Sequence, residues 1–129
     1  MKPTLSELQE TLREFVKQRN WEKFHDPKNL AMAIIVESAE RVQIFQWLTI
    51  EESKTLNNEM IENVKDEVAD IFIYLVRFCD VLGIDLVDSA FDKVKKNELK
   101  YPTHLVKGSA KKYTELRKTE KGRNPDETH

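Results

Sequence analysis

The sequence predicts an all-α protein, a bundle of four main helices. Gly and Pro number only 3 and 4 among the 129 residues, whereas 34% of the residues are charged. Few turn formers and many charges favour long helices with solvated outer faces over strands and tight turns. Apolar residues recur at helical spacing in several stretches joined by short polar segments, as in a helical bundle. A chain of this length is expected to form one domain, which oligomerisation would help to stabilise.

The first helix is expected from about Thr4 to Gln18. Thr4 and Glu7 have the spacing of a capping box, in which the threonine hydroxyl accepts from an amide of the first turn. The segment from Asn20 to Pro27 is predicted to be a loop, because proline disfavours helix at the residue before it. The apolar face of this first helix consists of Leu5, Leu8, Leu12 and Phe15.

The second helix is expected to start at Lys28 or Asn29 and to run to about Trp47. Its first half, residues 30–36, is apolar on all sides. A helix of this kind is buried, either inside its domain or between subunits. Thr49 and Glu52 then have the spacing of a second capping box, which predicts a short helical turn.

The third helix is expected from about Leu56 to Leu82, with Gly83 placed to end it. Asp85 is placed to cap a fourth helix, which Pro102 cannot continue. Residues 109–116 are expected to form a short final helix or an ordered arm. The polar, aperiodic residues 118–129 are expected to fray, so the predicted domain spans 1–117 and the tail 118–129.

Charge and cysteine content exclude several classes of protein. The net charge of −2 gives no positive field for nucleic acid. No apolar run approaches the ~20 residues that span a membrane, and no signal-peptide pattern opens the chain. The one cysteine, Cys79, cannot form an internal disulfide. A cytoplasmic protein is therefore expected.

Two pairs of acids stand out from this charged sequence. Glu37 and Glu40 directly follow the apolar run of the second helix, and Glu67 and Asp70 lie beside the apolar face of the third. Residues three apart share one side of a helix. If the two helices pack with these sides facing, four carboxylates share one pocket. Tyr74 lies one turn beyond Asp70 on the same stripe.

The pattern of acids leaves two interpretations open. Four carboxylates supply the hard oxygen ligands that Mg²⁺ or Mn²⁺ prefers. Alternatively, the acids form ion pairs across the bundle, with Arg41 and Arg77 as partners. A di-iron site fits less well, because such sites add a histidine three residues after a glutamate on a helix.

Further motifs accompany the acid pairs at fixed intervals. With these motifs, the chain resembles the all-α, MazG-like nucleoside triphosphate pyrophosphohydrolases, and within them the dCTP pyrophosphatase branch. The resemblance runs from about Leu5 to Leu116, and it favours the metal interpretation. The motifs are Trp21-Glu22-Lys23-Phe24-His25, Glu37-Ser38-Ala39-Glu40, Phe45-Gln46-Trp47, Glu67-Val68-Ala69-Asp70 and Lys100-Tyr101-Pro102.

The resemblance implies an enzyme that converts a nucleoside triphosphate, dCTP or a modified cytosine analogue, to the monophosphate and pyrophosphate, cleaning the nucleotide pool. Homodimers or tetramers (dimers of dimers), with sites where subunits meet, are also implied. The implied Mg²⁺ ligands are Glu37, Glu40, Glu67 and Asp70, with Glu37 or Glu40 positioning the attacking water. The implied substrate contacts are Trp21 and Trp47 on the base, Tyr74 at the sugar or base, and Lys93, Asn97 and Tyr101 at the phosphates.

The chain also departs from the family pattern. Animal dCTP pyrophosphatases carry a histidine nine residues before the first tryptophan, where this chain has Leu12, so a different base preference is open. Val36 and Gln43 stand where relatives often have acids, which leaves the number of metals open. Two rival hypotheses are a non-catalytic helical module that binds nucleotide or protein, and a related phosphohydrolase with another substrate.

Overall fold

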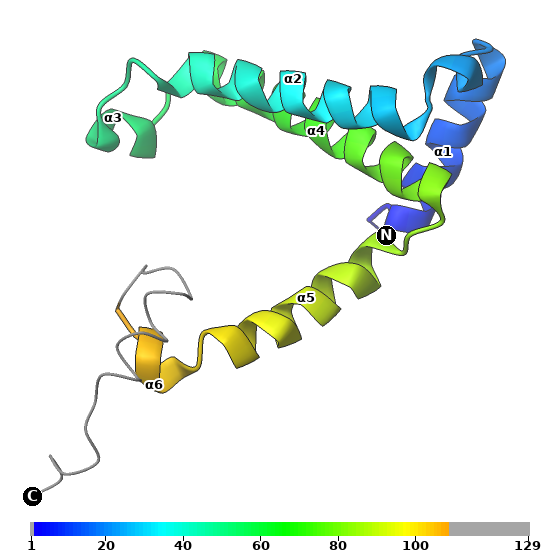
Figure 1. Cartoon of the computed structure of the whole chain (residues 1–129). Helices are drawn as coiled ribbons and strands as arrows, with labels where there is room; N and C mark the ends of the chain where they lie inside the picture. Colours follow the sequence, from blue (N-terminus) through cyan, green and yellow to red (C-terminus); the bar gives the residue numbers. More distant parts are fainter. Residues whose placement is uncertain (1, 109–129) are drawn as a thin grey trace, which may run out of the picture. The chain divides into compact units, whose positions relative to one another are not determined.

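A computed structural model describes residues 2–108, and Figure 1 shows its helices. Within these residues the chain is all-α and has no strand, which confirms the predicted fold class. The predictions for residues 109–116 and for the tail 118–129 lie outside the described residues, so the domain boundary stays a prediction. The helices are α1 (Leu5–Gln18), η1 (Glu22–Phe24), α2 (Pro27–Phe45), α3 (Ile50–Lys54), α4 (Asn58–Leu82), α5 (Leu86–Lys100) and α6 (Thr103–Val106).

The helix starts follow their capping residues. At α1 the Thr4 hydroxyl accepts from the Glu7 N–H at 3.2 Å, and the Glu7 carboxylate accepts from the Thr4 N–H at 3.1 Å. The same reciprocal pair forms at the predicted capping box before α3. Helix α2 starts at Pro27, slightly before the predicted start, because Asp26 accepts from the Asn29 N–H at 2.9 Å. Proline is well tolerated there, since the first helical position has no intrahelical partner for an N–H.

Helix α2 ends earlier than predicted, and both ends of α4 have local causes. Helix α2 ends at Phe45, before the predicted Trp47. Helix α4 starts at Asn58 rather than at Leu56, because the Asn57 side chain accepts from the first-turn amide of Met60 at 2.8 Å. It ends at Leu82, where Gly83 takes the left-handed conformation with φ of 68°, as predicted. The Ile84 N–H then donates to the Cys79 carbonyl at 2.8 Å, which satisfies an otherwise free group of the last turn.

The chain divides into two compact units, Met1–Leu86 and Val87–His129. In the first unit α2 lies alongside α4, and α1 packs against α4 (Figure 1). Their contact forms a small core, in which Cys79 is a buried free thiol. Among the described residues, the buried apolar side chains are Leu12, Val16, Leu30, Val76 and Cys79. None of the helices within residues 2–108 is long and apolar enough to cross a bilayer.

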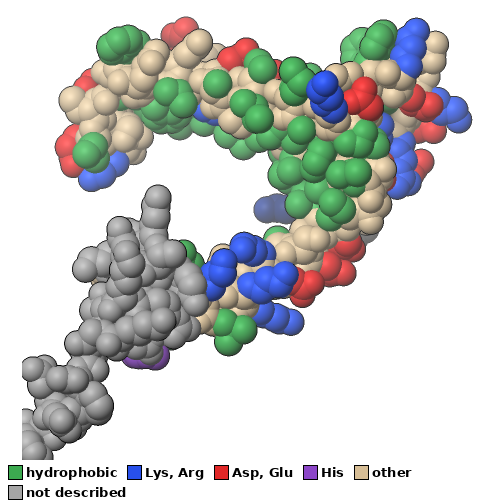
Figure 2. All heavy atoms as spheres, viewed as in Figure 1, with side chains coloured by type: hydrophobic (Ala, Val, Ile, Leu, Met, Phe, Trp, Pro, Cys, Tyr) green, Lys and Arg blue, Asp and Glu red, His purple; other side chains and the backbone are tan. Residues whose placement is uncertain are grey.

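The apolar run of α2 is largely uncovered in the single chain. Leu30 is buried at 2% exposure, but Met32, Ile35 and Val36 are 57%, 69% and 55% exposed. Figure 2 shows hydrophobic side chains on the surface of the α2–α4 pair. Burial of the whole run within the first unit is therefore wrong for these residues. Burial between subunits stays a prediction.

Candidate functional site

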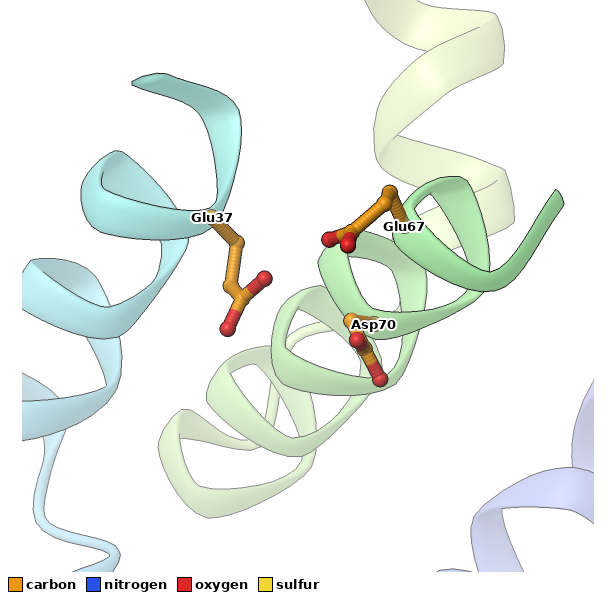
Figure 3. A group of neighbouring side chains, drawn as sticks. All are labelled: Glu37, Glu67 and Asp70. Carbon is orange, nitrogen blue, oxygen red and sulfur yellow. The ribbon is translucent and has the colours of Figure 1, made fainter. Parts of the chain in front are cut away.

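Three of the four predicted metal ligands meet between α2 and α4. Glu37 comes from α2, and Glu67 and Asp70 come from α4, where their spacing places them on one side (Figure 3). One oxygen of each carboxylate lies within 4.8 Å of the others. Glu40 is more peripheral, with a side chain that is 47% exposed. We call these four residues the acid cluster.

Arg41 lies in the acid cluster. Its terminal nitrogen Nη2 contacts Glu67 Oε2 and lies 3.6 Å from Glu40 Oε2 and 3.9 Å from Glu37 Oε2. Its Nε–H donates to the Glu37 carbonyl at 3.1 Å. The ion-pair interpretation is thus realised for Arg41. Arg77, the other predicted partner, instead pairs with Asp80.

Negative charge remains in excess at the acid cluster, because four carboxylates face one guanidinium. The pKa of Glu37 is raised above its usual value, first by burial and then by the charges of Glu40 and Asp70, while Arg41 opposes the shift. The donor set consists entirely of carboxylate oxygens, with no sulfur or imidazole among them. These residues therefore fit a hard divalent cation such as Mg²⁺ or Mn²⁺.

A cavity of about 300 Å³ lies beside the acid cluster in the same unit. Asp70 belongs to both, so the cavity adjoins the carboxylates. The predicted substrate residues Trp21 and Tyr74 line it, and Trp21 makes an edge-to-face contact with Phe15 at a centroid distance of 5.9 Å. The lining residues are Leu12, Phe15, Val16, Trp21, His25, Asp70, Ile73, Tyr74 and Arg77. A mostly apolar cavity with a few polar groups is typical of small-molecule sites.

His25 and Arg77 form a polar wall of the cavity that the sequence analysis missed. The Arg77 guanidinium donates from Nε to His25 Nδ1 at 3.4 Å and from Nη1 to Asp80 Oδ2 at 3.4 Å. Burial, followed by the charge of Arg77, lowers the pKa of His25. The sequence could have indicated Arg77 as a neighbour of Tyr74, because Asp70, Tyr74 and Arg77 follow one another at helical spacings of four and three residues and so share one side of the helix.

Trp47 is not part of this cavity. Its side chain is 85% exposed in the turn after α2, whereas Trp21 precedes α2. Helix α2 has 19 residues, and a rise of about 1.5 Å per residue separates its ends by roughly 28 Å. One chain therefore cannot form an aromatic slot from both tryptophans.

The three predicted phosphate contacts lie in the second unit. Lys93 and Asn97 are exposed and one turn apart on α5, and Tyr101 follows the end of that helix. The Tyr101 N–H donates to the Asn97 carbonyl at 2.8 Å, which extends the helical spacing to Tyr101. The three residues thus form a stripe along α5, and their contact with phosphates stays a prediction.

Comparisons with known proteins identify the family of this chain. The chain is 37% identical over 116 residues to dCTP pyrophosphatase 1 of Bos taurus, covering 88% of this chain and 69% of that protein. Over the same length it is 36% identical to dCTP pyrophosphatase 1 of Homo sapiens, covering 88% and 68%. The crystal structure of a pyrophosphatase from Archaeoglobus fulgidus superposes with a TM-score of 0.68 at 40% identity, covering 79% of this chain and 95% of that one. The sequence model of the MazG-like family matches residues 32–116, and the chain belongs to this family.

Proposed function

We propose that this protein is a nucleoside triphosphate pyrophosphohydrolase, with dCTP or a modified cytosine analogue as its substrate. The observation that carries the proposal is the position of Asp70, which joins a carboxylate cluster suited to a metal–phosphate complex to a cavity lined by aromatic residues. A nucleoside triphosphate combines the same two chemistries in one molecule. The similarity to dCTP pyrophosphatases supports the cytosine substrate.

In this proposal the acid cluster holds Mg²⁺, or Mn²⁺, through Glu37, Glu67 and Asp70, with Glu40 beside them. When bound, the ion would neutralise negative charge on the phosphate oxygens. Glu37 or Glu40 positions a water whose oxygen forms a bond to the α-phosphorus while that water releases one proton. The bond from that phosphorus to the bridging oxygen breaks, pyrophosphate leaves, and the nucleoside monophosphate remains.

The residues of the cavity hold the nucleoside part of the substrate. Trp21 offers a flat face for the base, and Tyr74 borders the sugar or base from the same stripe of α4 that carries Asp70. The polar wall of His25 and Arg77 adds hydrogen-bonding groups at the cavity. Lys93, Asn97 and Tyr101 are proposed to reach the phosphates.

A homo-oligomer, dimer or tetramer, is part of the proposal. The exposed apolar side chains of α2 support it, because large uncovered apolar surfaces mark interaction sites. Trp47 supports it as well, since only a neighbouring copy can place this side chain near Trp21. Light scattering after size-exclusion chromatography would report the mass of the assembly. We further propose a cytoplasmic role in nucleotide-pool sanitation, in keeping with the unpaired Cys79.

The test is pyrophosphate release from a panel of canonical and modified nucleoside triphosphates, with Mg²⁺ and with EDTA. The highest kcat/KM is expected with dCTP or a modified cytosine analogue, and EDTA should abolish release. Glu67→Gln and Asp70→Asn should each lower kcat by about 10³-fold or more, as losses at charge-stabilising groups do. Glu62→Gln is the matched control, because Glu62 lies on the same helix, is exposed and pairs with Lys65. Binding of nucleotide without any release would support the non-catalytic module instead.

A further inference from the structure

Arg41 occupies the position of a cation among the carboxylates of the acid cluster. A single nitrogen, Nη2, faces oxygens of Glu37, Glu40 and Glu67, which come from both helices. The guanidinium is held there by its own helix, because its Nε–H donates to the carbonyl of Glu37 one turn earlier. The position is therefore built into α2 and is not that of a freely moving surface side chain.

The surroundings of Arg41 are mostly dry. Its side chain is only 14% exposed, compared with 62% for Lys54 in a surface ion pair on α3. A buried guanidinium needs anionic partners, and removing water strengthens the attraction between such charges. The contacts of Arg41 therefore bind the acid cluster more firmly than a surface ion pair would.

Arg41 is nevertheless incompletely bonded. Among the described residues, no acceptor contacts its Nη1 atom, which is buried. A buried N–H without an acceptor is unfavourable. Arg41 thus offsets part of the negative charge of the acid cluster while one of its own N–H groups lacks an acceptor among the described residues.

We infer that Arg41 is a resident cation that competes with the divalent ion for Glu67, so that it holds the acid cluster together without metal and sets how tightly metal binds. This inference rests on the proposed function. Arg41 and a metal would both draw on the single carboxylate of Glu67, so metal binding weakens the contact of Glu67 with Arg41. Glu40 lies outside the three-carboxylate group and remains available as the partner of Arg41.

Arg41→Met tests the inference, because methionine keeps an unbranched apolar stem and removes the charge. The measurement is titration calorimetry of the full chain with Mn²⁺ and with Mg²⁺, without nucleotide. We expect Arg41→Met to bind Mn²⁺ at least about tenfold more tightly than the wild type, since a positive charge close to the ligands opposes the metal. In EDTA the variant should unfold at a lower temperature than the wild type, and saturating Mn²⁺ should narrow that difference.

Lys65→Met is the matched control. Lys65 lies on α4 two residues before Glu67, and it forms an exposed pair with Glu62 at 2.9 Å. This variant removes the same charge without touching the acid cluster, so its metal affinity should change by less than about twofold. Equal tightening in both variants, or unchanged or weaker binding in Arg41→Met, overturns the inference.

The outcomes also separate this inference from the proposed function. Mg²⁺-dependent pyrophosphate release together with unchanged metal affinity in Arg41→Met would leave the enzyme assignment standing and overturn the role of Arg41. No calorimetric binding of Mn²⁺ or Mg²⁺ by the wild type or by either variant would overturn both the metal site and the competition.

Discussion

Asp80 is the residue whose replacement should test the packing of the first unit most directly. It lies in the last turn of α4, and its side chain is only 10% exposed. It accepts from Gln9 Nε2 at 2.9 Å, from Arg13 Nε and Nη2 at 2.8 and 2.6 Å, and from Arg77 Nη1 at 3.4 Å. The contacts with Gln9 and Arg13 join α1 to α4, and the contact with Arg77 holds the guanidinium that lines the cavity.

The substitution Asp80→Asn removes one acceptor oxygen and the negative charge. Each oxygen accepts two of the four hydrogen bonds, so two are lost, and Arg77 keeps a buried charge without its anion. Hydrogen bonds to charged groups contribute about 1.5–3 kcal/mol each. Arg13 is half exposed, which reduces its share through solvent screening. A net loss of about 2–3 kcal/mol in the free energy of unfolding follows.

Urea denaturation at neutral pH, followed by circular dichroism, measures this loss. The hydrogen bonds and charge of Arg13, with smaller effects of Arg77 and Gln9, hold the pKa of Asp80 below its usual value. A carboxyl with a lowered folded pKa stabilises the protein fully above its unfolded pKa of about 3.9, and this contribution is lost as pH falls through the folded value. The difference between wild type and Asp80→Asn should therefore shrink below about pH 4. A loss under about 0.5 kcal/mol at neutral pH would refute the reasoning.

Four further substitutions have expected outcomes. Leu30→Ala should lower the free energy of unfolding by about 2–5 kcal/mol in urea, because this side chain is 2% exposed, and a loss under 1 kcal/mol would contradict its core position. Gly83→Ala should cost only about 1–2 kcal/mol in the same assay, since φ is 68° but a Cβ meets nothing within 4 Å, and a larger loss would reveal a contact not seen here. Trp21→Ala should raise KM for the best triphosphate about tenfold with little change in Tm. Trp47→Ala should raise KM only in an oligomer, so an effect in a monomer would exclude the neighbouring-copy arrangement.

Local signals made the helices predictable. Thr4 with Glu7 and Gly83 were identified from residue type and spacing, because a cap depends on a few neighbouring atoms. Asp26 was missed for a local reason too. The prediction used the rule that a residue before proline is disfavoured in a helix. Proline also suits the first position of a helix that an aspartate caps, as Pro27 does after Asp26.

The site was predictable only in part, because it depends on how two helices pack. The spacing of Glu67 and Asp70 placed them on one side of α4, but it did not show which acids Arg41 would contact. That contact depends on the relative register of α2 and α4, which no local pattern encodes. The separation of Trp21 from Trp47, in contrast, follows from sequence once the helix between them is known. The exposure of Ile35 could not be predicted from hydropathy, because hydropathy indicates that a residue tends to be buried but not which surface buries it.

The order of groups along α4 orients the substrate in the proposed function. Glu67 and Asp70 belong to the acid cluster, and Tyr74 and Arg77 line the cavity, so the metal–phosphate end lies toward the start of the helix and the base toward its end. The seven steps along the helix from Asp70 to Arg77 span roughly 10 Å at the rise of an α-helix. One rigid helix thus sets the distance between base and phosphates. A mispositioned base would displace the phosphates from the acid cluster as well, so changes in the cavity wall should lower kcat along with raising KM.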